Sequence, residues 1–453
     1  MKNTSPALAL ILTWVSPACA HHERVARPAE LEGRPLQGDT AFEGDATLTG
    51  LIEGELSVFV GRALAHAPEL RAAHARWRAS VAAASAAGRL PDPTLSYAGF
   101  VRAVETRVGP QRHRISLRQA FPWPGRLGAG REAMSARAAA EAEVFRARVL
   151  KLVLEVTESY WRLWTLERMH DIRLEHERLL EGLAETVKAR VETGEKSIAD
   201  LLQVQLRLQR LQDHRSDHKS QLRQGAARLA ASMGLEPGLQ IRTSPTPPRT
   251  GAVLPTRTAM VAELRHHPEV ARWAELAAAK QADGRVVRRT GWPDFVVGAD
   301  YIVTGAARGP DVPDDGKDPL ALSIGLSLPV WRGALAREAE AAEARAAAAQ
   351  AEGHRAWLDA LAQLESTLAK LEAARERIRR YERTLLPQAE ALESSVRAAY
   401  EVQRAGVASV LLALEDALEL KLALAEVRGR YAVAWAELDR LQAGPLARRE
   451  GLR

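Results

Sequence analysis

The sequence predicts a mainly α-helical protein built from two structural repeats, with a small β component whose strands are long enough to cross a membrane. Three observations predict this class. Four landmarks recur in the same order about 205 residues apart, four segments alternate apolar and polar residues, and long proline-free stretches carry a helical stripe. Each repeat is expected to be a helix, two strands and a long helical hairpin.

Composition and charge exclude several classes of protein. A single cysteine among 453 residues excludes a disulfide framework and multi-cysteine metal sites. The 63 Lys and Arg residues against 57 Asp and Glu make a mixed surface, so no nucleic-acid partner is predicted. Mean hydropathy is -0.22, and no apolar run approaches the roughly 20 residues of a spanning helix beyond the N-terminus.

The first twenty residues are typical of an export signal, with a basic start, an apolar stretch and a small-residue end. Two cleavage sites compete. Ala18-Cys19-Ala20 fits a peptidase site of the A-x-A type, which gives a signal peptide over 1–20. Ser16-Pro17-Ala18-Cys19 resembles a lipobox, which gives a lipoprotein signal over 1–18 and makes Cys19 the lipidation candidate. The residue after Cys19 is not aspartate, so resemblance to bacterial lipoproteins implies the outer membrane.

The repeats are recognised by four pairs of landmarks. The pairs are Ala67-Pro68-Glu69-Leu70 with His267-Pro268-Glu269-Val270, Leu90-Pro91-Asp92 with Trp292-Pro293-Asp294, Phe121-Pro122-Trp123 with Leu328-Pro329-Val330, and Gly194-Glu195-Lys196-Ser197 with Gly406-Val407-Ala408-Ser409. We therefore expect an N-terminal extension over 21–55, repeats over 56–245 and 246–445, and a tail over 446–453.

The alternating segments predict strands at about 93–102, 113–121, 294–304 and 319–328, joined by loops at Arg102–Arg112 and Gly305–Pro319. One face is apolar and the other carries Arg114, Arg118 and Asp300, which we expect to face a lumen without an assigned task. Strands of about ten residues cross a bilayer when tilted. Four strands cannot close a barrel, and a sheet edge cannot remain unpaired in lipid. Several chains must therefore combine their strands, and three chains give twelve strands. The alternative is a half-buried sheet of a soluble protein.

The helices are expected to be unusually long. No proline lies between Pro124 and Pro237, and Gly194 is placed like a turn. Hairpin helices are predicted over about 129–234 and 333–443, with tip turns at Gly194 and Ser197 and at Gly406 and Ser409. Pro387 should kink the second outgoing helix.

The strand–helix junction carries the most specific segment, Phe121-Pro122-Trp123-Pro124-Gly125. The prolines end the strand ladder, Trp123 suits a membrane interface, and Gly125 relieves crowding where the helix begins. The glycines from Gly125 to Gly130 lack a Walker lysine, so no nucleotide site is predicted.

From about Leu51 to Leu441, the chain resembles the TolC-like outer-membrane efflux proteins. The segment from Gln119 to Leu127 is similar to one frequent in the heavy-metal branch of the CusC/CzcC type, and Leu385-Leu386-Pro387-Gln388-Ala389 gives a second match. The resemblance implies a homotrimer with a twelve-stranded barrel in outer-membrane lipid, continued by a periplasmic helical tunnel that docks with an adaptor and an inner-membrane pump of the RND type.

The resemblance also implies pore residues at the tip. The family places an aspartate six residues after the turn glycine, a position that Asp200 occupies and that Leu412 takes in the second copy, with Glu415 just beyond. Asp200 and Glu415 are therefore gate candidates that would favour cations. Solvated helix-surface carboxylates are the alternative.

The resulting hypothesis is a passive exit duct without enzymatic activity, cofactor or resident metal, conducting heavy-metal cations. The alternatives are a duct for drugs or for type I secretion, a periplasmic coiled-coil adaptor or scaffold, and a metal-dependent hydrolase that uses His214 and His218. These two histidines are expected on a solvated helix face, because no third ligand accompanies them.

Overall fold

The computed structural model of the chain describes residues 51–309 and 311–443. Cys19, both predicted signal cleavage sites and the predicted tail lie outside the described residues. The described residues group into one compact unit. Within the described ranges, no helix combines the length and the apolar character needed to cross a membrane.

Two series of elements follow each other in the same order, which confirms the predicted repeat. The first series is β1 (Leu51–Gly54), α1 (Leu56–His66), α2 (Pro68–Ala86), β2 (Thr94–Thr106), β3 (Gly109–Phe121), α3 (Arg126–Glu192) and α4 (Ile198–Ser232). The second is β4 (Gln240–Thr243), α5 (Arg257–Leu264), α6 (Pro268–Thr290), β5 (Asp294–Thr304), β6 (Leu320–Ser327), α7 (Arg332–Arg380), η2 (Tyr381–Leu385), α8 (Leu386–Glu401) and α9 (Val407–Leu441).

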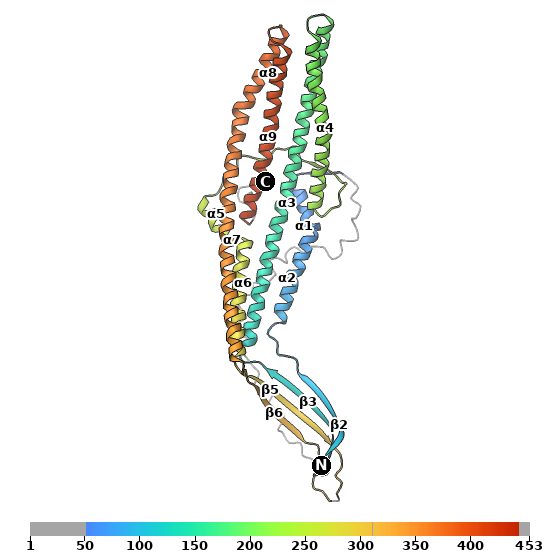
Figure 1. The fold of residues 1–453 in the computed structure, drawn as a ribbon, viewed down its shortest axis with the longest axis vertical. Coiled ribbons are helices and arrows are strands. Elements are labelled where there is room, and N and C mark those ends of the chain that lie inside the picture. The colour runs from blue at the N-terminus through green and yellow to red at the C-terminus, as the bar shows by residue number, and fades with distance from the viewer. Residues whose placement is uncertain (1–50, 310, 444–453) are drawn as a thin grey trace, which may run out of the picture. The chain divides into compact units, whose positions relative to one another are not determined.

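The four long strands form one antiparallel sheet in the order β2-β3-β5-β6 (Figure 1). Ile115 lies opposite Tyr97 on one side and Tyr301 on the other, and Tyr301 lies opposite Leu320. Because side chains alternate along a strand, this register puts the apolar residues of all four strands on one face. Within the described residues, β2 and β6 each have one edge without a partner strand.

The first hairpin is longer than the sequence predicted. Most of the expected loop Arg102–Arg112 is strand, and only Arg107 and Val108 separate β2 from β3, with an irregularity in register between Gly99 and Val104. Gly109 has φ 124°, and a Cβ there would lie 1.8 Å from the carbonyl oxygen of Gly305. This close approach of two backbones is a tertiary contact that the local pattern does not contain.

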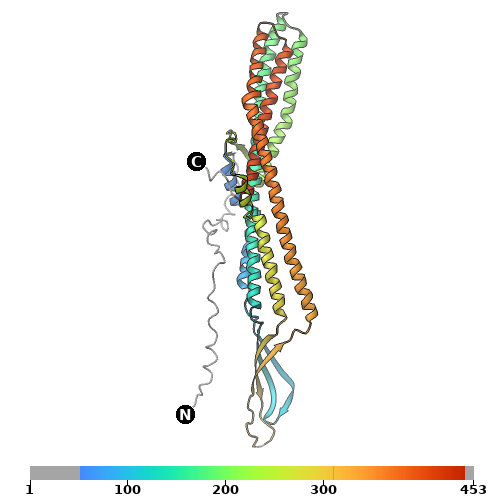
Figure 2. The same cartoon turned by 90° about the vertical axis from the view of Figure 1, so that its left-hand side faces the viewer.

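Long helices run from the sheet to two turns at their far ends (Figures 1 and 2). The helix α3 spans 67 residues and packs along α4, while α9 packs along α7, α8 and α3. The expected irregularity at Pro387 is a π-helical turn, Tyr381–Leu385, directly before the proline. Proline has no N–H to donate to the preceding turn, so the ladder widens there.

Each repeat has its own hydrophobic core near the middle of its long helices. The core of the first repeat centres on Phe59, Leu163 and Met233, and that of the second on Leu264, Leu364 and Leu438, all of which are fully buried. Elements that the sequence did not predict line the first core, because β1 and β4 pair in parallel and contribute Ile52 and Ile241.

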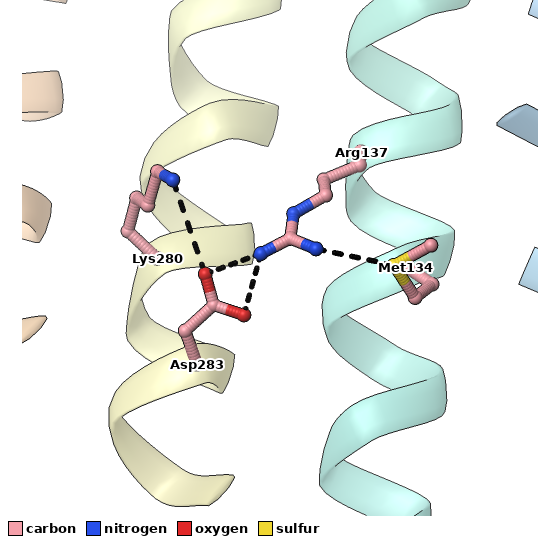
Figure 3. Close-up of polar contacts among 4 residues, drawn as sticks. All are labelled: Met134, Arg137, Lys280 and Asp283. Carbon is pink, nitrogen blue, oxygen red and sulfur yellow. Dashed lines mark hydrogen bonds and ion pairs between the residues drawn. The ribbon is translucent and has the colours of Figure 1, made fainter. Parts of the chain in front are cut away.

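The two repeats are joined beside the sheet by ion pairs between α3 and α6. Arg137 donates from one guanidinium nitrogen to both oxygens of Asp283, at 2.8 and 2.6 Å (Figure 3). Its other terminal nitrogen lies 3.1 Å from the sulfur of Met134, and the ammonium of Lys280 lies 3.9 Å from Asp283. Both partners of the main pair are half-buried, so the pair holds the two helices in a fixed register.

Candidate functional site

The apolar face of the sheet is exposed along its whole width. Leu322 and Ile324 of β6 expose 79% and 80% of their surface, which is unusual for large aliphatic side chains in a packed protein. The other exposed members of this face are Leu95, Tyr97, Ile115, Leu117, Phe121, Phe295, Val297, Tyr301, Leu320 and Leu326. We call these residues the apolar band. A band of this size marks a surface that meets lipid or another protein.

The opposite face of the sheet is polar and contains one buried acid. Asp300 is 6% exposed and accepts hydrogen bonds from Nε and Nη2 of Arg114 at 3.0 and 2.8 Å. The hydroxyl of Ser116 donates to the same carboxylate oxygen. Arg114 and Asp300, which the sequence placed on the polar face, therefore form a neutral cluster with Ser116 across β3 and β5.

The strand–helix junction is held by residues of the second repeat. The ladder between β3 and β5 ends with Phe121 opposite Phe295. Beyond it, Asp294 accepts the backbone N–H of Trp123 at 2.9 Å and pairs with Arg126 at 2.7 Å. The ring of Trp123 stacks on Trp292 with centroids 5.0 Å apart.

Gly125 occupies a conformation that favours glycine. Its φ is 83°, and a Cβ at this position would lie 2.7 Å from a guanidinium nitrogen of Arg289, which donates to the Gly125 carbonyl. The crowding that was predicted at this residue thus comes from the guanidinium of Arg289, which leaves no room for a side chain. The sequence did not predict the partners Asp294, Arg126 and Arg289, because more than 160 residues separate the two halves of the junction.

The first tip turn is a capping box. Gly194 has φ 78° and reverses the chain after α3. Ser197 is the N-cap of α4 and accepts the Asp200 N–H at 3.2 Å, while Asp200 accepts the Ser197 N–H at 3.2 Å and its hydroxyl at 2.9 Å. Asp200 is half-exposed, so its carboxylate has a local structural task besides any role in a pore.

The second tip turn has the same backbone, but its equivalent residues differ from those that the sequence suggested. Gln403, with φ 59°, takes the place of Gly194, and Gly406 takes the N-cap place of Ser197. Ser409 is therefore the counterpart of Asp200, and its backbone N–H bonds to the Gly406 carbonyl as that of Asp200 bonds to Ser197. The pairing of Gly194 with Gly406 was wrong, because glycine can serve as an N-cap as well as a left-handed residue.

The carboxylate of Glu415 is paired within the chain. Its Oε1 lies 2.5 Å from a guanidinium nitrogen of Arg207 on α4, and both side chains are partly exposed. The neighbouring Asp416 is exposed. Of the two gate candidates, Asp200 accepts its hydrogen bonds from uncharged groups, whereas Glu415 forms an ion pair.

A contact between the repeats also lies at the tips. Arg190 of α3 donates to the Tyr400 carbonyl at 3.2 Å, and its guanidinium carbon lies 4.7 Å from the centre of the Tyr400 ring. Lys196 lies 5.2 Å from the same ring. These residues cover the buried tip cluster that contains Val187, Val204 and Leu414. This contact was not predicted from the sequence.

Comparison with known proteins finds a family similar to part of this chain. The sequence profile described as "Outer membrane efflux protein" matches residues 59–235, which run from α1 to the end of the first repeat's helical hairpin. Over these residues the chain is similar to the outer membrane efflux protein family. No curated protein sequence matches the chain at a significant level.

Solved structures of outer-membrane proteins share the fold of both repeats. VceC from Vibrio cholerae has TM-score 0.69 and 21% identity over 86% of this chain and 96% of its own. CusC has TM-score 0.70 and 17% identity over 86% and 92% of the two chains. The open state of MtrE from Neisseria gonorrhoeae has TM-score 0.70 and 15% identity over 86% and 89%. CusC is no more similar than the others, so the heavy-metal branch is not singled out.

One of the two histidines predicted on a solvated face of the first repeat is placed differently from the prediction. His214 is exposed as expected, but His218 is buried at 4% exposure between α4 and α3. Its Nε2–H donates to the Leu166 carbonyl at 2.8 Å, and its Nδ1 accepts from Arg173 at 3.1 Å. The expected solvated face for both residues was wrong for His218, because the helical stripe of α4 does not reveal how deeply α3 covers it.

Burial sets the charge state of this histidine. It lowers the pKa of His218 below 6.5, since a charged imidazole would lose its hydration, and the neighbouring Arg173 and His170 act in the same direction. Burial also lowers the pKa of His176 and of His267. Within residues 51–309 and 311–443, no group of three or more His, Cys, Asp or Glu side chains is placed to hold a metal ion.

Proposed function

We propose that this chain is the exit duct of a tripartite efflux system in the bacterial outer membrane, through which substrate passes without chemical change. The observation that carries the proposal is the apolar band on one face of a four-stranded sheet whose outer edges are unpaired. The band suits the hydrocarbon of a bilayer, and the polar face suits a water-filled lumen. A periplasmic scaffold would have no use for such a band.

The unpaired edges favour assembly with further copies of the chain. Lipid offers no hydrogen-bond partner to the backbone groups of β2 and β6, so each edge must pair with another strand. A sheet of four strands is too narrow to close on itself. Three copies supply twelve strands, which is a comfortable barrel and agrees with the trimer that the family resemblance implies.

The helix tips give a second and independent reason for a neighbouring copy. Val407 and Leu411, the first and fifth residues of α9, are 1% and 5% exposed, because they pack on α3 of the first repeat. Their counterparts in α4, Ile198 and Leu202, are 67% and 57% exposed. In a ring, the second repeat of the next chain would cover these two side chains as the first repeat covers Val407 and Leu411.

The equivalence of the two repeats also suggests how β6 of one chain and β2 of the next would be aligned at the joint between neighbouring chains. Within one chain, Gln119 of β3 lies opposite Val297 of β5. The corresponding residues of β6 and β2 are Leu326 and Leu95, which would lie opposite each other across the joint. Both then belong to the outward face, so the apolar band continues around the barrel without a break.

Two further features extend the proposal to the membrane and to the partners. Cys19 would carry a lipid anchor in the outer membrane. The helix tips would dock with a periplasmic adaptor and an RND-type inner-membrane pump, which supplies the energy. We propose Asp200 as a pore-lining carboxylate at this entrance, with Glu415 contributing less because Arg207 compensates its charge.

We also propose a substrate class for the duct. The junction segment resembles that of the heavy-metal branch, which favours metal cations, while drugs and secreted polypeptides are the alternative cargoes within the same family. A host strain without this gene should become sensitive to the substrate class. Sensitivity to metal salts alone would support metal export, and sensitivity to organic drugs alone would contradict it.

The duct itself is tested with the full chain. We expect it in the outer-membrane fraction as a heat-resistant trimer, and we expect the purified trimer to conduct ions across a planar lipid bilayer. Recovery as a soluble monomer that adds no conductance would overturn the proposal.

A further inference from the structure

One level of the polar sheet face contains a single large side chain. Across the four strands, Thr94 lies opposite Arg118, Arg118 opposite Gly298, and Gly298 opposite Ser323. Three of these four residues are small. The guanidinium of Arg118 is therefore the one group of this level that reaches far from the sheet.

The fold makes room for Arg118 at this level. A Cβ on residue 298 would lie 2.6 Å from the Ser323 hydroxyl oxygen and 3.3 Å from Cγ of Arg118. Gly298 has an ordinary strand conformation, so its lack of a side chain is explained by this crowding and not by backbone strain. The stem of Arg118 lies over Gly298 and next to Ser323.

Arg118 has no ion-pair partner within the described part of the chain. Its side chain is exposed, and no ion pair or hydrogen bond joins its guanidinium to another group among those residues. The nearest acid on this face, Asp300, is occupied at the next level by Arg114 and Ser116. The middle of the polar face thus carries one net positive charge per chain.

We propose that Arg118 is a selectivity residue that gives the strand-lined part of the duct a preference for anionic solutes, such as organic carboxylates and sulfonates. The inference rests on the proposed assembly, in which three copies of Arg118 would form a ring at one level of the lumen. A confined passage lined by one sign of charge concentrates counter-ions about tenfold or more. This ring disfavours the free metal cations named above as cargo, whatever the carboxylates do at the other end, and it favours the organic cargoes named as their alternative.

Chemical modification of a nearby thiol measures the electrostatic field of Arg118 at this level of the sheet. Ser323→Cys places a thiol beside Arg118, and the thiol is treated with two methanethiosulfonate reagents of similar size, one carrying a sulfonate and one a quaternary ammonium group. We expect the anionic reagent to react about tenfold faster at low salt, with a smaller ratio at high salt. Cys19 is the only native cysteine, so its reaction is measured in the chain without the substitution and subtracted.

Two further variants make the test decisive. Arg118→Gln in the Ser323→Cys background should bring the ratio of the two rates close to that of the free reagents. Arg112→Gln is the matched control, because Arg112 is also exposed on β3 but lies six residues away, about 20 Å along the strand. An equal ratio in the presence and absence of Arg118, or no anion preference in the parent, would overturn the inference.

The failure of this inference and of the proposed duct are distinguishable. A conducting trimer without the rate bias would leave the duct standing and remove Arg118 as a selectivity residue. A rate bias in a protein that forms no trimer and conducts no ions would support the local effect of Arg118 and contradict the proposed duct. As a second readout, Arg118→Gln should shift the zero-current potential in a salt gradient toward cation preference.

Discussion

The carboxylate of Asp294 accepts a hydrogen bond from the backbone amide of Trp123 at 2.9 Å, although 171 residues separate them. The other oxygen of the same carboxylate pairs with Arg126 at 2.7 Å. One side chain at the start of β5 therefore holds the point where β3 of the first repeat becomes helix α3. The contact fixes the direction in which the long helix leaves the sheet.

Asp294→Ala should loosen this junction. The variant leaves the Trp123 amide and Arg126 without their acceptor, and we expect a loss of about 1–2 kcal/mol per chain in the free energy of unfolding. Thermal unfolding of the detergent-solubilised protein measures it. Asp294→Asn should lose less, since an amide oxygen still accepts from Trp123, and Asp416→Ala serves as an exposed control. Equal stability of the Asp294 and Asp416 variants would contradict this role.

The register between chains is open to crosslinking. With Leu95→Cys and Leu326→Cys in one chain, mild oxidation should give covalent dimers and trimers on non-reducing gels, because the two positions lie opposite each other in the proposed joint. The pair Leu95→Cys and Leu322→Cys is displaced by four residues, about 13 Å, and should crosslink poorly. Equal crosslinking of both pairs would show that the register differs. Covalent multimers from the displaced pair alone would rule out the proposed one.

The two tasks of Asp200 are separable by substitution. Ser197→Ala removes the cap but keeps the carboxylate, so it should cost about 1 kcal/mol of stability and leave the cation preference of the channel unchanged. Asp200→Asn keeps hydrogen-bonding capacity at the cap but removes the charge, so it should shift the zero-current potential away from cations or raise the conductance. Unchanged selectivity and conductance in Asp200→Asn would remove this residue from the pore.

Stability should fall in mild acid. The pKa of His218 is lowered in the folded protein, so the unfolded chain takes up the proton first as the pH falls below 6.5. The stability that neutral His218 contributes is present above that pH and is lost as the pH falls toward the folded pKa. His176 and His267 act with the same sign.

Thermal midpoints between pH 7.5 and 5.5 measure this effect. His218→Gln should flatten the pH dependence, whereas the exposed His214→Gln should leave it as it is. A profile with the same slope in His218→Gln would assign the effect to other groups.

Local patterns were sufficient to predict the four long strands and the long helices, though not all of their bounds. Alternation along Leu320–Leu328 predicted a strand with one apolar face, and the proline-free stretch after Pro124 predicted a long helix, because both signals depend only on neighbours in the chain. Features that depend on contact with another segment of the chain were predicted less reliably. The β1–β4 pair, the close approach of Gly109 to Gly305 and the burial of His218 all depend on segments far apart in sequence.

By itself, the sequence determined the two repeats, the four alternating strands and the residue types at the junction and the tips. Only the tertiary structure decided which residues are equivalent at the tips, which charges are paired, and which remain free. Asp300 and Arg118 are both polar-face residues in the alternation. Asp300 is buried in a neutral cluster, whereas Arg118 is exposed and has no ion-pair partner among residues 51–309 and 311–443. Periodicity assigns a side chain to a face, whereas its charge balance is set by the strands beside it, and these come from the other repeat.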